Sequence, residues 1–106
     1  MTTSSRHELL VGMHVTDDDS YATYRAEMTP LLSAAGGFFR YDFTIDQVLK
    51  GPTDPAINRL FVISFPGERE MAAFFELPEY LDIRRKYFEP AVSRTEILAT
   101  FEAAPT

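Results

Sequence analysis

Residues 7–15 read HELLVGMHV, and residues 60–65 read LFVISF. Alternate side chains of an extended segment point to opposite faces, so each of these segments is apolar on nearly both faces. Two apolar faces are typical of a strand in the middle of a sheet, which is covered on both sides. We therefore expect these segments to form the centre of a sheet, with the rest of the chain supplying its edges and its cover.

Residues 38–49 differ, because apolar and polar side chains alternate strictly along them. One face would hold Phe39, Tyr41, Phe43 and Ile45, and the other Arg40, Asp42, Thr44 and Asp46. Such alternation predicts a half-exposed strand at an edge of the sheet. Residues 50–58, KGPTDPAIN, contain two prolines and one glycine and predict a loop. A last strand is expected from about Arg94 to Phe101.

Two helical regions separate the strands. Thr16 and the three aspartates after it resemble a capping box, so we expect a helix from here to about Ala35, ended by Gly36-Gly37. Its inward stripe would be Tyr21, Tyr24, Met28, Leu31 and Ala35. A second helix is expected over residues 68–76, and Pro78 fits the first turn of a further helical segment that ends near Pro90.

The resulting order is β-α-β-β-α-β, the ferredoxin-like arrangement of the α+β class, with a four-stranded antiparallel sheet. Right-handed crossovers place the first and third strands at the centre, in agreement with their two apolar faces. Both helices then cover one face of the sheet, which leaves the opposite apolar face open to water in a monomer. We therefore expect a homodimer in which two such faces pack together.

Composition limits the class of protein further. A chain of 106 residues allows one domain, residues 1–106, with its core at about 8–101. The net charge of −6 provides no basic surface for a phosphate backbone, so no nucleic-acid partner is expected. Without cysteine there are no disulfides, thiolate zinc sites or cysteine nucleophiles. No signal-peptide core or membrane-spanning apolar run is visible, so we expect a cytoplasmic protein with no membrane partner.

Several short motifs occur together along the chain. They are Asp17, Tyr21, Tyr24, Gly36-Gly37, Gly51, Arg59, Phe65-Pro66, Pro78-Glu79-Tyr80, and Arg84 or Arg85. Together they resemble a bacterial family known mainly as a domain of unknown function, numbered 1330, over roughly residues 9–101. The resemblance implies a dimeric α+β barrel, in which two ferredoxin-like sheets pack face to face. Relatives in that superfamily include cofactor-free monooxygenases of antibiotic biosynthesis, muconolactone isomerases and chlorite dismutases, so the resemblance implies an assembly rather than one chemistry.

Two features depart from the family pattern. The loop KGPTDPAIN has no obvious counterpart of the family's aromatic residue after the second strand, and the closing glycine is missing after Phe101. Substrate contacts carried by loops are therefore not transferred to this chain.

Arg84 is the candidate binding residue that simple core packing explains least well. Tyr80, Leu81, Arg84, Tyr87 and Phe88 share one face at helical spacing, so a guanidinium stands in an aromatic stripe. A buried guanidinium requires an anion, which is either a ligand carboxylate or Asp42, Asp46 or a glutamate of the partner subunit. Alternatively the side chain runs along apolar surface and keeps its charge in water. Tyr24, Tyr80, Arg40 and Arg59 complete the predicted substrate-binding set.

His14 is the candidate catalytic residue. It shares a strand face with Gly12, whose missing side chain would leave space beside an imidazole able to exchange protons near neutral pH. The alternative is a histidine that is hydrogen-bonded inside the dimer interface. Asp42 and Asp46 are either an acid/base pair or the solvated face of an edge strand.

No metal or cofactor site is expected. After His7-Glu8 the second histidine of a helical zinc motif would fall at Val11, and neither a glycine-rich phosphate loop nor a dinucleotide fingerprint is present. Haem would need an axial ligand, for which only His7 and His14 are available among the histidines.

These observations support two hypotheses about function. In the first, the homodimer binds a small organic acid or aromatic compound between sheet and helices, and acts as a cofactor-independent enzyme of oxygenase or isomerase type with His14, Tyr24 and Arg84. In the second, the homodimer is structural or regulatory and has no turnover. A cavity lined by those three residues would favour the first, and a filled core with Arg84 paired internally would favour the second.

Overall fold

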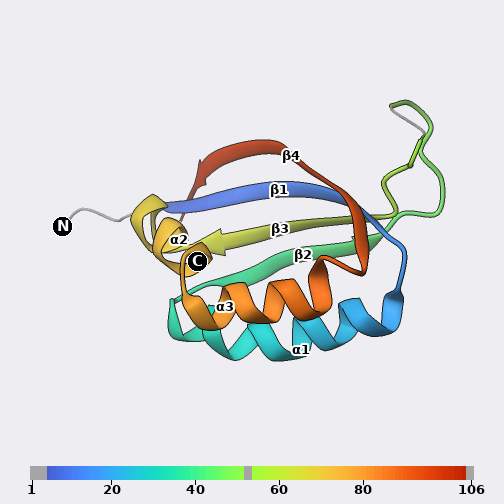
Figure 1. Cartoon of the computed structure of the whole chain (residues 1–106). Helices are drawn as coiled ribbons and strands as arrows, with labels where there is room; N and C mark the ends of the chain where they lie inside the picture. Colours follow the sequence, from blue (N-terminus) through green and yellow to red (C-terminus); the bar gives the residue numbers. More distant parts are fainter. Residues whose placement is uncertain (1–4, 52–53, 105–106) are drawn as a thin grey trace.

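The computed structural model describes residues 5–51 and 54–104. Four strands and three helices follow one another, and a π-helical turn extends the third helix (Figure 1). Their bounds are β1 Arg6–Val15, α1 Asp18–Ala34, β2 Phe38–Thr44, β3 Arg59–Phe65, α2 Glu68–Phe75, α3 Pro78–Ile83, η1 Arg84–Phe88 and β4 Val92–Ala103.

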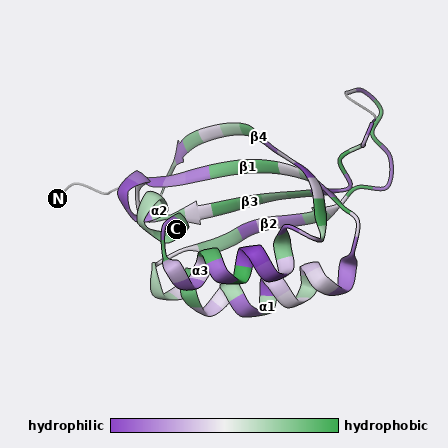
Figure 2. Ribbon diagram, in the orientation of Figure 1, coloured by the Kyte–Doolittle hydropathy of each residue, from purple (hydrophilic) through white to green (hydrophobic). Residues whose placement is uncertain are grey.

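The four strands form one antiparallel sheet in the order β2-β3-β1-β4. The ferredoxin-like fold is therefore confirmed, and so is the central position of the two strands with apolar faces, β1 and β3. In Figure 2 both strands carry hydrophobic residues along much of their length. Since each central strand is paired on both edges, only β2 and β4 present an open edge.

The helices lie on one face of this sheet (Figure 1). Leu9, Val11, Met13 and Val15 of β1 point to that face and are almost fully buried. They pack against Phe65 and Phe74, against α1 and against the π-helical turn in one hydrophobic cluster. The opposite face carries the alternate residues, among them Leu10, Gly12 and His14, and no helix covers it.

Helix α1 begins one residue later than the capping box predicts. Asp17 is its N-cap, and the Asp17 side chain accepts a hydrogen bond from the Ser20 amide at 3.1 Å. The Thr16 hydroxyl instead donates to the Ala91 carbonyl at 3.1 Å, which links the start of α1 to the turn between η1 and β4. The helix ends before Gly36, which has a φ of +79°, a conformation that favours glycine.

The buried stripe of α1 is Tyr21, Tyr24, Met28 and Leu32. Leu32 therefore takes the deepest position, where the sequence predicts Leu31, and Leu31 is only partly buried. The difference is one residue at the last turn of a helix, where steps of three and of four are equally compatible with a stripe.

Strand β2 differs from its predicted pattern in two ways. It ends at Thr44 rather than near residue 49, because its partner β3 begins only at Arg59. It also contains an irregularity at Arg40, since Phe39 pairs with Ile63 but Tyr41 pairs with Val62. This β-bulge reverses the alternation beyond Arg40, so Phe39 and Asp42 face the helices while Tyr41 and Phe43 face away. The prediction that Phe39, Tyr41 and Phe43 share a face is therefore wrong.

A candidate ligand cavity beneath the helices

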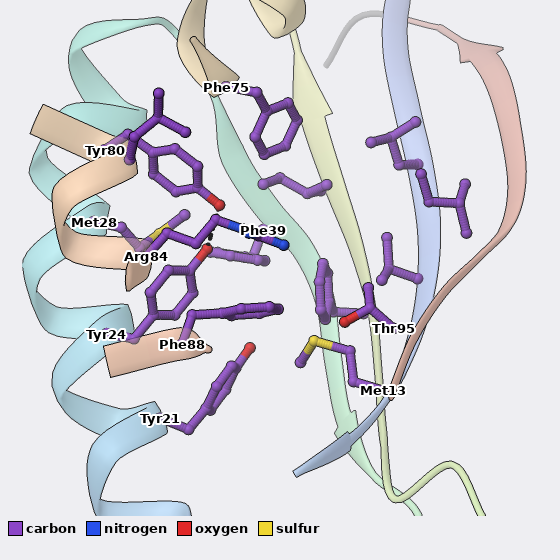
Figure 3. A pocket seen from close by; sticks show the side chains of 16 residues that line it. Met13, Tyr21, Tyr24, Met28, Phe39, Phe75, Tyr80, Arg84, Phe88 and Thr95 are labelled. Atoms are coloured by element: carbon purple, nitrogen blue, oxygen red, sulfur yellow. Dashed lines mark hydrogen bonds between the residues drawn. The ribbon is translucent and has the colours of Figure 1, made fainter. Parts of the chain in front are cut away.

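A cavity of about 390 Å³ lies between the helices and the face of the sheet that they cover. Its floor includes Leu9, Val11 and Met13 of β1 together with Phe61 and Ile63 of β3. The helical walls come from α1, α3 and η1, and Figure 3 shows their side chains converging on the same space. The walls are mostly hydrocarbon and aromatic, which is typical of a small-molecule pocket.

The cavity opens between α3 and β4. Leu81 of α3 and Ile97 of β4 line it and are 45% and 59% exposed, although both are large apolar residues. Apolar side chains left in water at the mouth of an apolar cavity mark a path by which a ligand can enter.

The π-helical turn η1 brings three cavity-lining side chains onto the same face of the helix. The Glu89 amide donates to the Arg84 carbonyl at 2.9 Å, which is a bond across five residues. In an α-helix, residues four apart are offset by about 40° around the axis. In the wider π-helical turn, residues four apart are offset in the opposite direction. The offset from Tyr80 to Arg84 and the offset from Arg84 to Phe88 therefore largely cancel, and the three side chains line up along one face. All three line the cavity.

Two tyrosine hydroxyls meet on the helical wall of the cavity. The Oη atoms of Tyr24 and Tyr80 are 2.7 Å apart, and both residues are at least 95% buried. Burial raises the pKa of Tyr24, and the contact with Tyr80 raises it further. Burial also raises the pKa of Tyr80, although hydrogen bonds from Tyr24 and Arg84 oppose the shift. Both phenols therefore stay protonated at neutral pH, when they are hydrogen-bond donors rather than bases.

Arg84 points into the cavity beside these hydroxyls (Figure 3). Its guanidinium carbon lies 4.8 Å from the centroid of the Phe88 ring, and Nη1 lies 3.4 Å from Oε2 of Glu89. Because the Arg84 and Glu89 side chains are 39% and 56% exposed and the contact is long, this ion pair is weak. Neither simple burial nor strong internal pairing therefore explains Arg84.

Arg59 lies behind the cavity wall rather than in the cavity. Its Nε and Nη2 donate to the two oxygens of Asp42 at 2.8 and 2.9 Å. Arg25 of α1 binds the same carboxylate. Burial alone would raise the pKa of Asp42, but the two arginines hold it below its usual range. Asp42 is thus an ion-pair partner on the helix face, and the structure does not bring it together with Asp46 as an acid/base pair.

His14 lies on the opposite face of the sheet from the cavity. Its Nδ1 is 2.6 Å from the Ala56 carbonyl, to which it donates as Nδ1–H. The space expected above Gly12 is filled by Ile57, because a Cβ on Gly12 would lie 2.7 Å from Ile57 Cδ1. The structure therefore does not bring His14 together with Tyr24 and Arg84, and a catalytic role for His14 stays a prediction.

Arg40 also lies on that opposite face. Its Nε is 3.0 and 2.8 Å from the carboxylate oxygens of Glu8, and Nη2 is 2.7 Å from Glu8 Oε2. Glu8 is only 1% exposed although it lies on the face that no helix covers. Arg6, in turn, donates to Ser64 on the same face at 2.7 Å. Of the predicted substrate-binding residues, only Tyr24, Tyr80 and Arg84 therefore line the cavity.

Sequence reasoning missed Tyr21, which it treats as a core residue. Tyr21 is 2% exposed and lines the cavity, and its side chain points inward in Figure 3. The available signal was the choice of tyrosine over phenylalanine at a buried helical position, since a buried hydroxyl needs a partner.

Within the described ranges, no group of three or more His, Cys, Asp or Glu residues is arranged to hold a metal ion. In the same part of the chain, no helix has the length and apolar character needed to cross a bilayer.

Comparisons with solved structures give the same fold. A protein of unknown function from Rhodopseudomonas palustris aligns with a TM-score of 0.77 at 17% identity, over 97% of this chain and 84% of that one. A dabb family protein with a ferredoxin-like fold from Mesorhizobium loti has a TM-score of 0.63 at 12% identity, over 96% and 98%. A hydroxynitrile lyase from Passiflora edulis has a TM-score of 0.62 at 15% identity, over 97% of each chain. At these identities the likeness concerns the fold alone.

No curated protein matches the sequence. The family model described as Domain of unknown function (DUF1330) matches residues 9–100, which is most of the chain. This protein therefore belongs to the DUF1330 family.

Proposed function

We propose that this protein binds a small aromatic carboxylic acid in the cavity beneath its helices. The observation that carries the proposal is a mostly apolar cavity in which one guanidinium and two phenol hydroxyls lie together on the helical wall. Liquid water occupies about 30 Å³ per molecule, so a cavity of about 390 Å³ has room for about a dozen non-hydrogen atoms. A ligand of one aromatic ring with short substituents has this size.

The polar part of the cavity matches a carboxylate. Arg84 offers a planar pair of N–H donors, and its contact with Glu89 is weak enough for a ligand anion to replace it. One of the Tyr24 and Tyr80 hydroxyls donates to the other, which leaves the proton of the second for the ligand, and the hydrocarbon walls bury the ring of the ligand.

The more specific form of this proposal is that the protein is a cofactor-independent enzyme of oxygenase or isomerase type. The described residues that line the cavity include no Asp, Glu or His, and the raised pKa values of Tyr24 and Tyr80 make them donors. Such a site would stabilise a negatively charged oxygen of an enolate or phenolate rather than abstract a proton. One structural neighbour is a hydroxynitrile lyase, so the fold is used by at least one enzyme. A binding protein without turnover would use the same cavity.

A homodimer is the second part of the proposal. On the face that no helix covers, the rings of Tyr41 and Phe43 stack at 5.9 Å and are 56% and 50% exposed. Phe38 and Phe101 lie on the same face and are 38% and 40% exposed. An aromatic surface of this kind is typical of a protein interface, and a second copy of the sheet would cover it.

The test of ligand binding uses benzoate and the variant Arg84→Lys. The lysine keeps the charge but loses the two-pronged contact, so we expect the dissociation constant of benzoate to rise about tenfold. The matched control is Arg85→Lys, because the Arg85 side chain is 63% exposed and pairs with Asp82 outside the cavity. Calorimetric titration of the three proteins measures the effect. Equal affinities in all three, or no binding of benzoate to the unmodified protein at millimolar concentration, would contradict the proposal.

A further inference from the structure

The hydroxyl of Tyr21 is a polar group in the apolar part of the cavity. The Tyr21 ring packs against Tyr24 and Phe88, with centroids 5.6 and 6.5 Å away. Figure 3 shows its hydroxyl pointing into the cavity, apart from the pair formed by Tyr24 and Tyr80. In the described part of the chain this hydroxyl has no hydrogen-bond partner, whereas the Tyr24 and Tyr80 hydroxyls bond to each other.

A buried hydroxyl without a partner is unfavourable, and a phenylalanine would fill the same space without it. Tyr21 is 2% exposed and lines the cavity, so water or a ligand in the cavity is what its hydroxyl can bond to. The favourable arrangement is therefore one in which a molecule in the cavity supplies the missing partner.

The charges around Tyr21 indicate what that partner is. The guanidinium carbons of Arg59 and Arg25 lie 5.0 and 5.5 Å from the centroid of the Tyr21 ring, and Asp42 binds both arginines. Burial raises the pKa of Tyr21 to about 12, although the two arginines act in the opposite direction. The hydroxyl is thus a proton donor at neutral pH. Because both arginines are paired with Asp42 behind the ring, a neutral oxygen suits this position better than a second carboxylate.

We propose that Tyr21 determines specificity, by donating a hydrogen bond to a phenol or ring-carbonyl oxygen at the end of the ligand away from its carboxylate. Tyr21 precedes Tyr24 by three residues of α1, which is about 4.5 Å along the axis. The two oxygen groups of the ligand are then separated by one aromatic ring, as in a para-hydroxylated aromatic acid. This inference rests on the proposed function, because it needs the carboxylate to be held by Arg84.

The test compares benzoate with 4-hydroxybenzoate, which differ by one hydroxyl. We expect the unmodified protein to bind 4-hydroxybenzoate about three- to tenfold more tightly, the range of one net hydrogen bond. In Tyr21→Phe this preference should fall to less than about twofold, while the affinity for benzoate stays the same. The control Tyr41→Phe changes an exposed tyrosine on the other face and should keep the preference. The phenylalanine variant keeps the ring and removes a hydroxyl without a protein partner, so the fold is retained.

The possible outcomes separate the inference from the proposed function. If benzoate binds and depends on Arg84, but 4-hydroxybenzoate is not preferred or the preference survives in Tyr21→Phe, the inference is wrong and the proposed function stands. If neither acid binds at millimolar concentration, the proposed function fails and the inference fails with it.

Discussion

The two faces of the sheet come from the same strands but carry different kinds of side chain. The face beneath the helices is aromatic and aliphatic, yet it keeps a cavity in which Arg84 lies beside the Tyr24 and Tyr80 hydroxyls. The open face encloses the ion pair of Glu8 and Arg40 and leaves Tyr41 and Phe43 half exposed. An enclosed space with a few converging donors suits a small molecule, whereas exposed aromatic rings suit a protein surface.

The largest effect is expected on assembly, through the open face. A chain of 12.0 kDa should form a dimer of about 24 kDa at micromolar concentration. Phe43→Lys places a charge among the aromatic rings of the open face, so we expect it to yield the 12.0 kDa monomer. Leu81→Lys is the matched control, since Leu81 is similarly exposed but lies at the mouth of the cavity. Light scattering after size exclusion measures both masses, and a folded monomer of the unmodified chain would refute the dimer.

The next largest effect concerns the cavity. Val11 is 5% exposed on the cavity floor, so Val11→Phe places a ring in the space that we assign to the ligand. Because this ring enters an existing cavity, we expect the benzoate affinity to fall at least about tenfold while the protein stays folded and dimeric. Titration calorimetry measures the benzoate affinity, and light scattering measures whether the variant is still a dimer. Unchanged benzoate affinity in the folded variant would place the ligand elsewhere.

A smaller effect distinguishes the two tyrosines of α1. Tyr24→Phe removes the 2.7 Å hydrogen bond between two buried hydroxyls, so the free energy of unfolding should fall by about 1 kcal/mol. Tyr21→Phe removes no protein hydrogen bond in the described part of the chain, so its unfolding free energy should not fall. Urea denaturation of both variants measures the difference. A larger loss in Tyr21→Phe than in Tyr24→Phe would contradict the hydrogen bonding described above.

The smallest effect is a pH dependence that belongs to the open face. Burial would raise the pKa of Glu8, but hydrogen bonds from Arg40 and Ser64 and the charges of Arg40 and Arg6 hold it below its ordinary value of 4.5. Glu8 therefore stabilises the fold above about pH 4.5, and this contribution is lost as the pH falls through its lower folded-state pKa. In Glu8→Gln that part of the pH dependence should disappear from denaturation curves recorded between neutral and acid pH. Glu27→Gln, an exposed change on α1, is the control, and equal profiles for both variants would contradict this role of Glu8.

The sequence predicts the architecture because the decisive property is visible in it. Strands β1 and β3 carry apolar side chains on both faces. Such a strand is stable only when another strand pairs with each of its edges and other residues cover each of its faces. The alternation within β1 also separates Met13 from His14. The same alternation could have excluded a site that joins His14 to Tyr24, because the more apolar face of β1 is the one that the helices cover.

The details of the candidate site depend on irregularities of the backbone that hydrophobic periodicity does not reveal. The bulge at Arg40, in the pairing of β2 with β3, turns Asp42 toward the helices. The wide turn from Arg84 to Phe88 keeps Arg84 in line with Tyr80, and periodicity places Arg84 on that face without revealing the turn. The cavity itself is a volume left between elements, which no single segment encodes.

The most direct test of the central claim is to locate a bound aromatic acid by NMR of protein labelled with ¹³C at the methionine methyl groups. Met13 and Met28 line the cavity, whereas Met71 packs against the core from α2 and does not line it. An aromatic ring in the cavity changes the local magnetic field, so titration with benzoate should shift the Met13 and Met28 signals to saturation and leave the Met71 signal in place. A Met71 signal that moves while those of Met13 and Met28 stay fixed, or no shift of any of the three when benzoate is bound, would contradict binding beneath the helices.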